Sequence, residues 1–117
     1  MNKFLVLYMA PAAGLEEWSK TDPEVRKVAE EKMRAEWGAW MAGHTGLIKE
    51  TAGAGKTKRV TSQGSTDVKN DIMLYSVVEG ESPEAVASVF QNHPHFGIPN
   101  SWIEVMPIHM LPAGQEL

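Results

Sequence analysis

Phe4-Leu5-Val6-Leu7-Tyr8-Met9 and Ile72-Met73-Leu74-Tyr75-Ser76-Val77-Val78 are the two strongly apolar runs of this sequence. Short runs that stay apolar along their length are typical of interior strands covered on both faces. Each run precedes a predicted helix, over residues 22–42 in the first case and residues 82–92 in the second. The chain therefore repeats a unit of one strand followed by one helix.

Both predicted helices begin with a capping residue followed by proline. Asp22 with Pro23, and Ser82 with Pro83, combine a side chain that accepts from free amides with a residue that has no amide to satisfy. Gly43 ends the first helix. The expected buried face of that helix is apolar at spacings of three and four, and consists of Val25, Val28, Ala29, Met33, Trp37, Trp40 and Met41.

Two further strands complete the predicted sheet. Residues 58–62 are β-prone but polar, which suits an edge strand, whereas residues 44–55 indicate a glycine-rich loop with a brief extended piece. Residues 63–70 are rich in turn formers, and residues 102–106 form the last strand. The order strand, helix, strand, strand, helix, strand predicts an α+β fold of the ferredoxin-like βαββαβ type, a four-stranded antiparallel sheet with two helices on one face.

The two apolar strands predict a partner for this sheet. Phe4, Val6 and Tyr8 alternate with Leu5, Leu7 and Met9, so both faces of the strand are apolar. Helices cover one face only, and the other would expose a large apolar patch to water. We therefore expect a homodimer whose sheets pack face to face.

Composition excludes several classes of function. The 117 residues, 43% of them hydrophobic, indicate a single domain over residues 1–117. With 15 acidic and 11 basic residues, the net charge of −4 argues against nucleic-acid binding. No apolar run approaches the roughly 20 residues of a membrane span, and the first residues do not form a secretion signal, so we expect no membrane partner and a cytoplasmic location. The absence of cysteine removes disulfides and thiol chemistry.

Several short strings resemble the YCII-related proteins of the dimeric α+β barrel superfamily. They are the opening residues 3–8, Trp37-Gly38-Ala39-Trp40, residues 75–79, His93-Pro94 and residues 103–107, and the resemblance spans nearly the whole chain. It implies a ferredoxin-like subunit, a face-to-face dimer and a pocket between sheet and helices. A histidine on the first helix and an aspartate before the proline are often taken as the functional pair of that family. Here His93 precedes Pro94 and the nearest helix-one histidine, His44, lies beyond the helix, so this pair is not carried over.

His93 and His95 are the candidate catalytic residues. A histidine titrates near neutrality and can act as a general acid or base, and the adjacent Pro94 can fix its orientation. The alternative is a structural histidine in a turn. The pair could also offer two imidazoles to a metal, with His44, His109 or Asp71 completing the shell, but two ligands are too few for a site and we predict none.

The candidate ligand-binding residues are Tyr8, Tyr75 and His44. Either phenol can point into a pocket or toward the rim of the sheet, because the sequence does not fix the register. Trp37 and Trp40 have the spacing of core residues rather than of a cofactor site.

Residues 54–57, Ala-Gly-Lys-Thr in sequence, are not a phosphate loop. The motif requires a glycine at position 50, which is Glu50, and no helix is predicted to follow Lys56. This glycine-rich stretch can instead act as a lid over a pocket.

Two functional classes stay open. The one we favour is a binding or accessory dimer with a pocket for a small organic ligand and no cofactor. The other is a cofactor-free enzyme, of the isomerase, lyase or hydrolase type, in which His93 or His95 moves a proton. Folds of this kind host many activities, so the fold does not decide between them.

Overall fold

The computed structural model describes residues 2–111 and has an α+β architecture. Four strands form the main antiparallel sheet, in the spatial order β2-β5-β1-β6. Their bounds are β1 Asn2–Met9, β2 Ile48–Gly53, β5 Ile72–Gly80 and β6 Trp102–Pro107. This order, with its helical crossovers, is that of the ferredoxin-like βαββαβ arrangement, as the sequence predicted.

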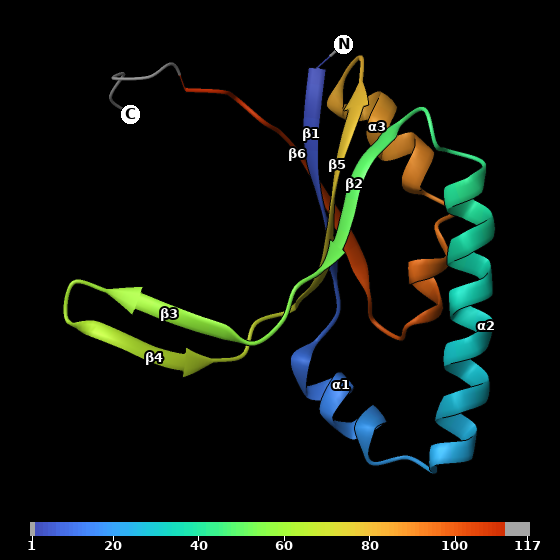
Figure 1. Cartoon of the computed structure of the whole chain (residues 1–117), viewed down its shortest axis with the longest axis vertical. Helices are drawn as coiled ribbons and strands as arrows, with labels where there is room; N and C mark the ends of the chain where they lie inside the picture. The colour runs from blue at the N-terminus through green and yellow to red at the C-terminus, as the bar shows by residue number, and fades with distance from the viewer. Residues whose placement is uncertain (1, 112–117) are drawn as a thin grey trace.

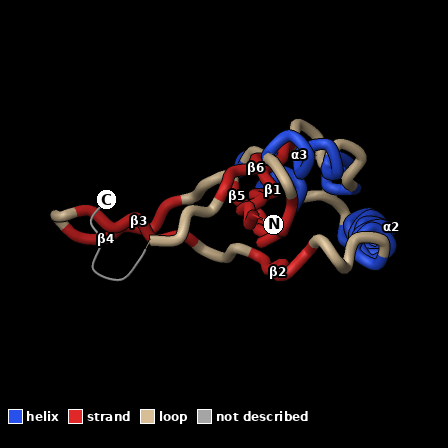
Figure 2. The backbone as a smooth tube through the Cα atoms, turned by 90° about the horizontal axis from the view of Figure 1, so that it is seen from above, coloured by secondary structure: helices blue, strands red, loops and turns tan. Residues whose placement is uncertain are grey.

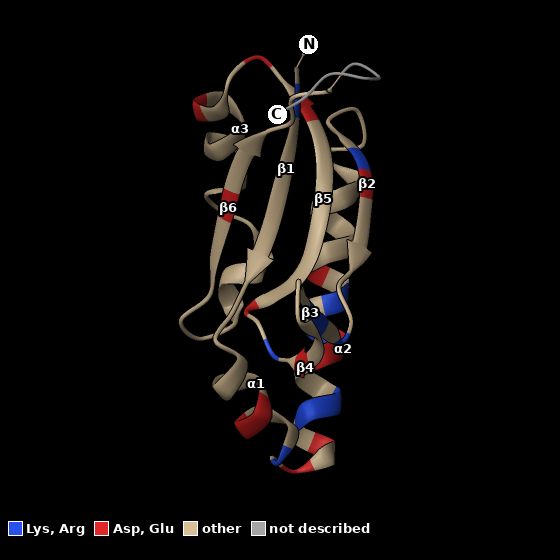
Figure 3. Ribbon diagram, turned by 90° about the vertical axis from the view of Figure 1, so that its left-hand side faces the viewer, with Lys and Arg blue, Asp and Glu red and all other residues tan. Residues whose placement is uncertain are grey.

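Helices α2, Pro23–Ala42, and α3, Pro83–Phe90, lie on the same side of the sheet (Figure 1). Figure 3 views the opposite, helix-free face, with β1 and β5 in the middle of the sheet. The predicted caps are confirmed. Asp22 accepts a hydrogen bond from the amide of Glu24 at 2.8 Å, and Ser82 accepts one from the amide of Ala85 at 3.1 Å.

The core lies between the sheet and the helices. Alternate residues of β1 face the helices and are buried, while Leu5, Leu7 and Met9 lie on the helix-free face and are half-buried. The buried cluster consists of Phe4, Val6, Tyr8, Val78, Val86 and Phe90. Both central strands therefore carry apolar residues on both faces, as their sequences predicted.

The predicted second strand is wrong in its position. The edge strand of the sheet is β2, which lies in the stretch that the sequence indicated as a loop, and it pairs with β5. The segment predicted as the edge strand becomes β3, Thr57–Thr61, which pairs with β4, Gly64–Val68, and not with the main sheet. Residues 63–70, predicted as turns, therefore contain a strand. Gly64, at φ 132°, permits the tight turn between β3 and β4.

The β3–β4 hairpin projects from the helix-free side of the sheet, away from α2 and α3 (Figure 2). Its two strands pair with each other, and nearly all their residues are exposed. An isolated two-stranded hairpin is only marginally stable in water. Ion pairs support it: Lys58 pairs with Asp67 within the hairpin, and Lys69 at its base pairs with Glu16.

A short helix that the sequence did not predict, α1, spans Ala12–Ser19. Its first residue, Ala12, donates its amide to Oδ1 of Asp71 at 2.9 Å. The capping residue is 59 positions away in the sequence, so no local pattern predicts this helix. α1 lies beyond the end of the sheet, beside the start of α2 (Figure 1).

The predicted buried face of α2 is wrong in its first half. Val25 and Val28 are 57% and 66% exposed, whereas Met33, Trp37 and Trp40 are half-buried. The N-terminal half of α2 runs past the end of the sheet, so no sheet surface is present to cover its valines (Figure 1). Among residues 2–111, no helix combines the length and the apolar composition that a membrane crossing requires.

Candidate functional site

His93 and His95 lie at the end of α3 and point into the interior. His93 is 2% exposed and His95 is fully buried. His93 caps the short 3-10 helix η1, Pro94–Gly97, because its Nδ1 accepts the amide of His95 at 2.9 Å. The proline at the first position of η1 has no amide to satisfy and holds this turn rigid.

Hydrogen bonds fix the protonation of both rings. Nδ1 of His93 accepts, so the single proton of the neutral ring is on Nε2. Nε2 of His95 donates to the carbonyl of Met9 at 2.8 Å, so its Nδ1 carries no proton. Within the described chain, Nε2 of His93 and Nδ1 of His95 are buried without a hydrogen-bond partner.

Aromatic rings surround His93. The centroids of Trp37 and Trp40 are both 4.4 Å from its ring, that of Tyr8 is at 5.1 Å and that of Phe90 at 5.7 Å. Burial among these rings, with smaller contributions from the neighbouring His95 and His44, lowers the pKa of His93 to about 4. Burial also lowers the pKa of His95, against the opposing effect of its bond to Met9.

Neutral His93 is therefore a hydrogen-bond donor at pH 7. Its one basic nitrogen is engaged with a backbone amide, and its Nε2–H faces aromatic rings. Proton transfer by His93, which stays a prediction, would require the ring to leave its cap on His95. Trp37 and Trp40 pack against the core, as their spacing predicted.

The structure separates the other candidate residues. Tyr8 and Tyr75 point to opposite faces of the sheet, since Tyr8 pairs with Leu74 and Leu7 pairs with Tyr75. Tyr75 donates its hydroxyl to Glu50 on the helix-free face. His44 stacks on Trp40 with centroids 4.0 Å apart, and its Nδ1 donates to the carbonyl of Trp40 at 2.7 Å.

The suggested metal ligands do not meet. Asp71 is engaged with the amide of Ala12, and His109 is exposed after β6. In the part of the chain that the structure describes, no three histidine or carboxylate side chains are grouped to hold a metal ion.

Three hydroxyl groups form a chain across the helix-covered face of the sheet. The hydroxyl of Tyr8 lies 2.7 Å from Oγ of Ser76, which in turn lies 2.7 Å from Oγ1 of Thr51. The chain crosses β1, β5 and β2 in order. Burial raises the pKa of Tyr8 to about 12, so its phenol stays protonated. The sequence did not single out Ser76 or Thr51, because the pairing that brings them together involves β2, a strand that the sequence did not predict.

Thr51 also lines a pocket between α2 and β2. The pocket has a volume of about 470 Å3 and is a shallow depression that is widely open to solvent. Its wall combines Gly38, Met41, Ala42 and Ile48 with the hydroxyl-bearing Thr45 and Thr51. Lys49 and Glu50 complete it. A residue of the hydroxyl chain thus contributes to the wall of an apolar pocket.

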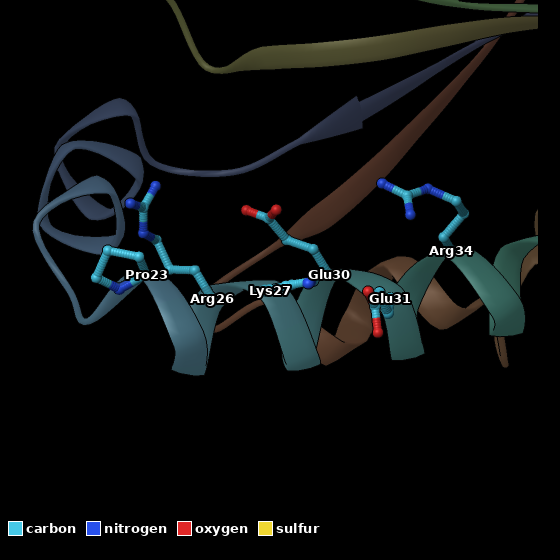
Figure 4. A pocket seen from close by; sticks show the side chains of 6 residues that line it. All are labelled: Pro23, Arg26, Lys27, Glu30, Glu31 and Arg34. Atoms are coloured by element: carbon cyan, nitrogen blue, oxygen red, sulfur yellow. The ribbon is translucent and has the colours of Figure 1, made fainter.

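A smaller pocket of about 200 Å3 lies along the N-terminal half of α2 (Figure 4). Arg26, Glu30 and Arg34 project from one side of the helix there, at spacings of four. Its wall alternates in charge and is solvent-exposed, which is typical of the surface of a helix rather than of a ligand site. His93 does not line this pocket and packs instead against Trp37 and Trp40, in the C-terminal half of α2.

No protein-family model matches the chain, and no curated protein matches it. Among solved structures, the fold is similar to 5-chloro-2-hydroxyhydroquinone dehydrochlorinase, TftG, from Burkholderia phenoliruptrix AC1100, solved in complex with 2,5-dihydroxybenzoquinone. The match has 14% sequence identity and a TM-score of 0.45, and covers 89% of this chain and 91% of that one. A likeness of this degree assigns neither a ligand nor a reaction to the present chain.

Proposed function

We propose that this protein binds a small organic molecule in the pocket between α2 and β2. The observation that carries the proposal is the combination of apolar walls with the hydroxyl of Thr51, in a volume of about 470 Å3. Small-molecule sites are mostly apolar clefts of roughly 300–1,000 Å3 with few polar groups that fix orientation. A proton-transferring enzyme is the less favoured alternative, because the contacts of His93 and His95 are with the interior.

Gly38 supports this location. Glycine in the middle of a helix costs about 0.5–1 kcal/mol relative to alanine. A Cβ added at Gly38 would meet no atom within 4 Å, so packing does not require glycine. Gly38 is part of the pocket wall. We infer that the missing side chain leaves room for the ligand, at the expense of helix stability.

Two substitutions of Gly38 test the pocket. Gly38→Ala is expected to raise the free energy of unfolding by about 0.5–1 kcal/mol, measured by urea unfolding. Gly38→Leu places a larger side chain in the pocket and is expected to abolish binding of a neutral aromatic probe, acetophenone, followed by amide chemical shifts in NMR titrations. Gly14→Leu is the matched control, because Gly14 lies in α1 with open space around it and outside the pocket. Equal binding by Gly38→Leu and Gly14→Leu would refute the location.

We further propose that the protein is a homodimer of the dimeric α+β barrel type, joined through the helix-free face. The YCII resemblance of the sequence supports this assembly. The face carries Leu5, Leu7 and Met9 on β1, and Met73 and Val77 on β5. The chain exposes 8318 Å2, against about 6300 Å2 expected for a monomeric protein of 12.9 kDa. The exposed β3–β4 hairpin and the N-terminal half of α2 contribute to this excess of about 2000 Å2, so the apolar residues of the helix-free face are what support the assembly.

Leu7→Asp tests the dimer. A carboxylate at the centre of this face would lose its water on association without gaining a partner, so we expect dimerisation to weaken at least 100-fold. Val28→Asp is the control, because Val28 is exposed on α2, away from this face. Sedimentation velocity at 1–100 μM measures both variants. A wild-type protein that sediments as a monomer across this range would contradict the assembly.

A further inference from the structure

The hydroxyl chain has a direction that the arrangement of its partners determines. Each of the three hydroxyls, on Tyr8, Ser76 and Thr51, carries one proton and can also accept. Both links measure 2.7 Å, and distance alone leaves the donor of each link open. The direction follows from the two ends of the hydroxyl chain. The hydroxyl of Tyr8 is enclosed in the core, whereas Thr51 lines the pocket.

Tyr8 is the enclosed end. The residue is fully buried, and Ser76 is the only hydrogen-bond partner of its hydroxyl within the described chain. If the phenol accepted from Ser76, its own proton would be buried without an acceptor among the rings of Trp37 and Phe90. A buried donor without an acceptor is costly, so Tyr8 donates to Ser76. Its raised pKa keeps this proton in place.

The remaining two links follow from the first. Ser76 accepts from Tyr8 and is fully buried, so its single proton goes to Thr51. Thr51 accepts that proton and keeps its own. Its hydroxyl makes no other hydrogen bond within the described residues, and the residue lines the pocket.

We propose that Thr51 is a hydrogen-bond donor in the wall of the pocket, and that the ligand is a small apolar molecule bearing an acceptor oxygen, such as a ketone or aldehyde carbonyl. The apolar body would contact Met41, Ala42 and Ile48. The ligand class rests on the proposed binding function, whereas the direction of the hydroxyl chain does not. A ligand that only donates could use the second lone pair of Thr51, but the proton of Thr51 would then have no acceptor in the ligand.

Matched probes test the ligand class. Acetophenone has a carbonyl oxygen where α-methylstyrene, which has the same shape, has a methylene group. In NMR titrations of the full chain we expect acetophenone to bind about three- to tenfold more tightly, the range of one net hydrogen bond. Thr51→Val, which keeps the shape of the side chain, is expected to reduce this ratio to about one. Tyr8→Phe leaves Thr51 as the only acceptor for the buried proton of Ser76 within the described residues, so the ratio is expected to stay as in the wild type.

Each outcome has a distinct meaning. If both probes bind equally to the wild type and Gly38→Leu excludes both, the binding function stands and the donor role of Thr51 is overturned. If neither probe binds, the proposed function fails. Neutron diffraction from deuterated crystals then determines the direction of the hydroxyl chain independently. The deuterium of Tyr8 is expected to point toward Ser76, and that of Ser76 toward Thr51. A deuterium of Ser76 directed at Tyr8 would overturn the inference without reference to any ligand.

Discussion

Acidification from pH 7 to pH 4 is expected to lower the free energy of unfolding by about 3 kcal/mol through His93 alone. The pKa of this buried ring is about 4 in the folded protein, against an ordinary value of 6.5. Between these values the unfolded chain binds a proton that the folded chain does not. The stability associated with neutral His93 is therefore fully present above pH 6.5 and is lost as the pH falls toward 4.

A difference between variants isolates this effect, because carboxylates also titrate near pH 4. His93→Asn keeps a side-chain acceptor for the amide of His95 and does not titrate. Urea unfolding at pH 7 and pH 4, at one protein concentration, should show a loss about 3 kcal/mol smaller in His93→Asn than in the wild type. His109→Asn, at an exposed position, should lose as much stability as the wild type. An unchanged pH dependence in His93→Asn would show that the ring is not held neutral.

The central strands could be predicted from the sequence, because each is a continuous apolar run covered by helices on one side. The caps at Asp22 and Ser82 could be predicted as well, since a cap is a local interaction. The edge strand β2 could not be predicted from the sequence. Its residues, Ile48–Gly53, are mixed in polarity and include glycine, and pairing with β5 determines their conformation. Residues 58–62, which the sequence predicted as the edge strand, do lie largely in a strand, β3, but its partner is the adjacent β4.

In the candidate site, too, residues that are close in sequence could be placed together, whereas residues brought together by strand pairing could not. His93 and His95 are two positions apart, so their common location could be predicted. The choice between Tyr8 and Tyr75 depended on strand register, which places them on opposite faces. The link from Tyr8 through Ser76 to Thr51 joins residues 68 and 25 positions apart. This link could not be predicted from the sequence, because it depends on the pairing of β2 with β5.

Gly80→Ala is expected to destabilise the protein by about 1–3 kcal/mol, the usual range for overpacking a core. Gly80 is the last residue of β5, where α3 crosses close to the sheet. A Cβ at this position would clash with Cγ2 of Val86. Val86 is buried and β-branched, so it cannot rotate away without strain. The backbone of α3 must move instead, and the chain leads directly from α3 to His93.

The same substitution at a second strand end supplies the control. Gly53 is the last residue of the neighbouring β2, and a Cβ there would meet no atom within 4 Å. Gly53→Ala should therefore change the free energy of unfolding by no more than about 0.5 kcal/mol. A double-mutant cycle identifies the contact: if Val86 is the obstacle, Gly80→Ala combined with Val86→Ala will be more stable than the sum of the two single changes predicts. Additive effects would mean that another contact makes glycine necessary at position 80. The close approach of α3 to β5 would then not determine where His93 lies.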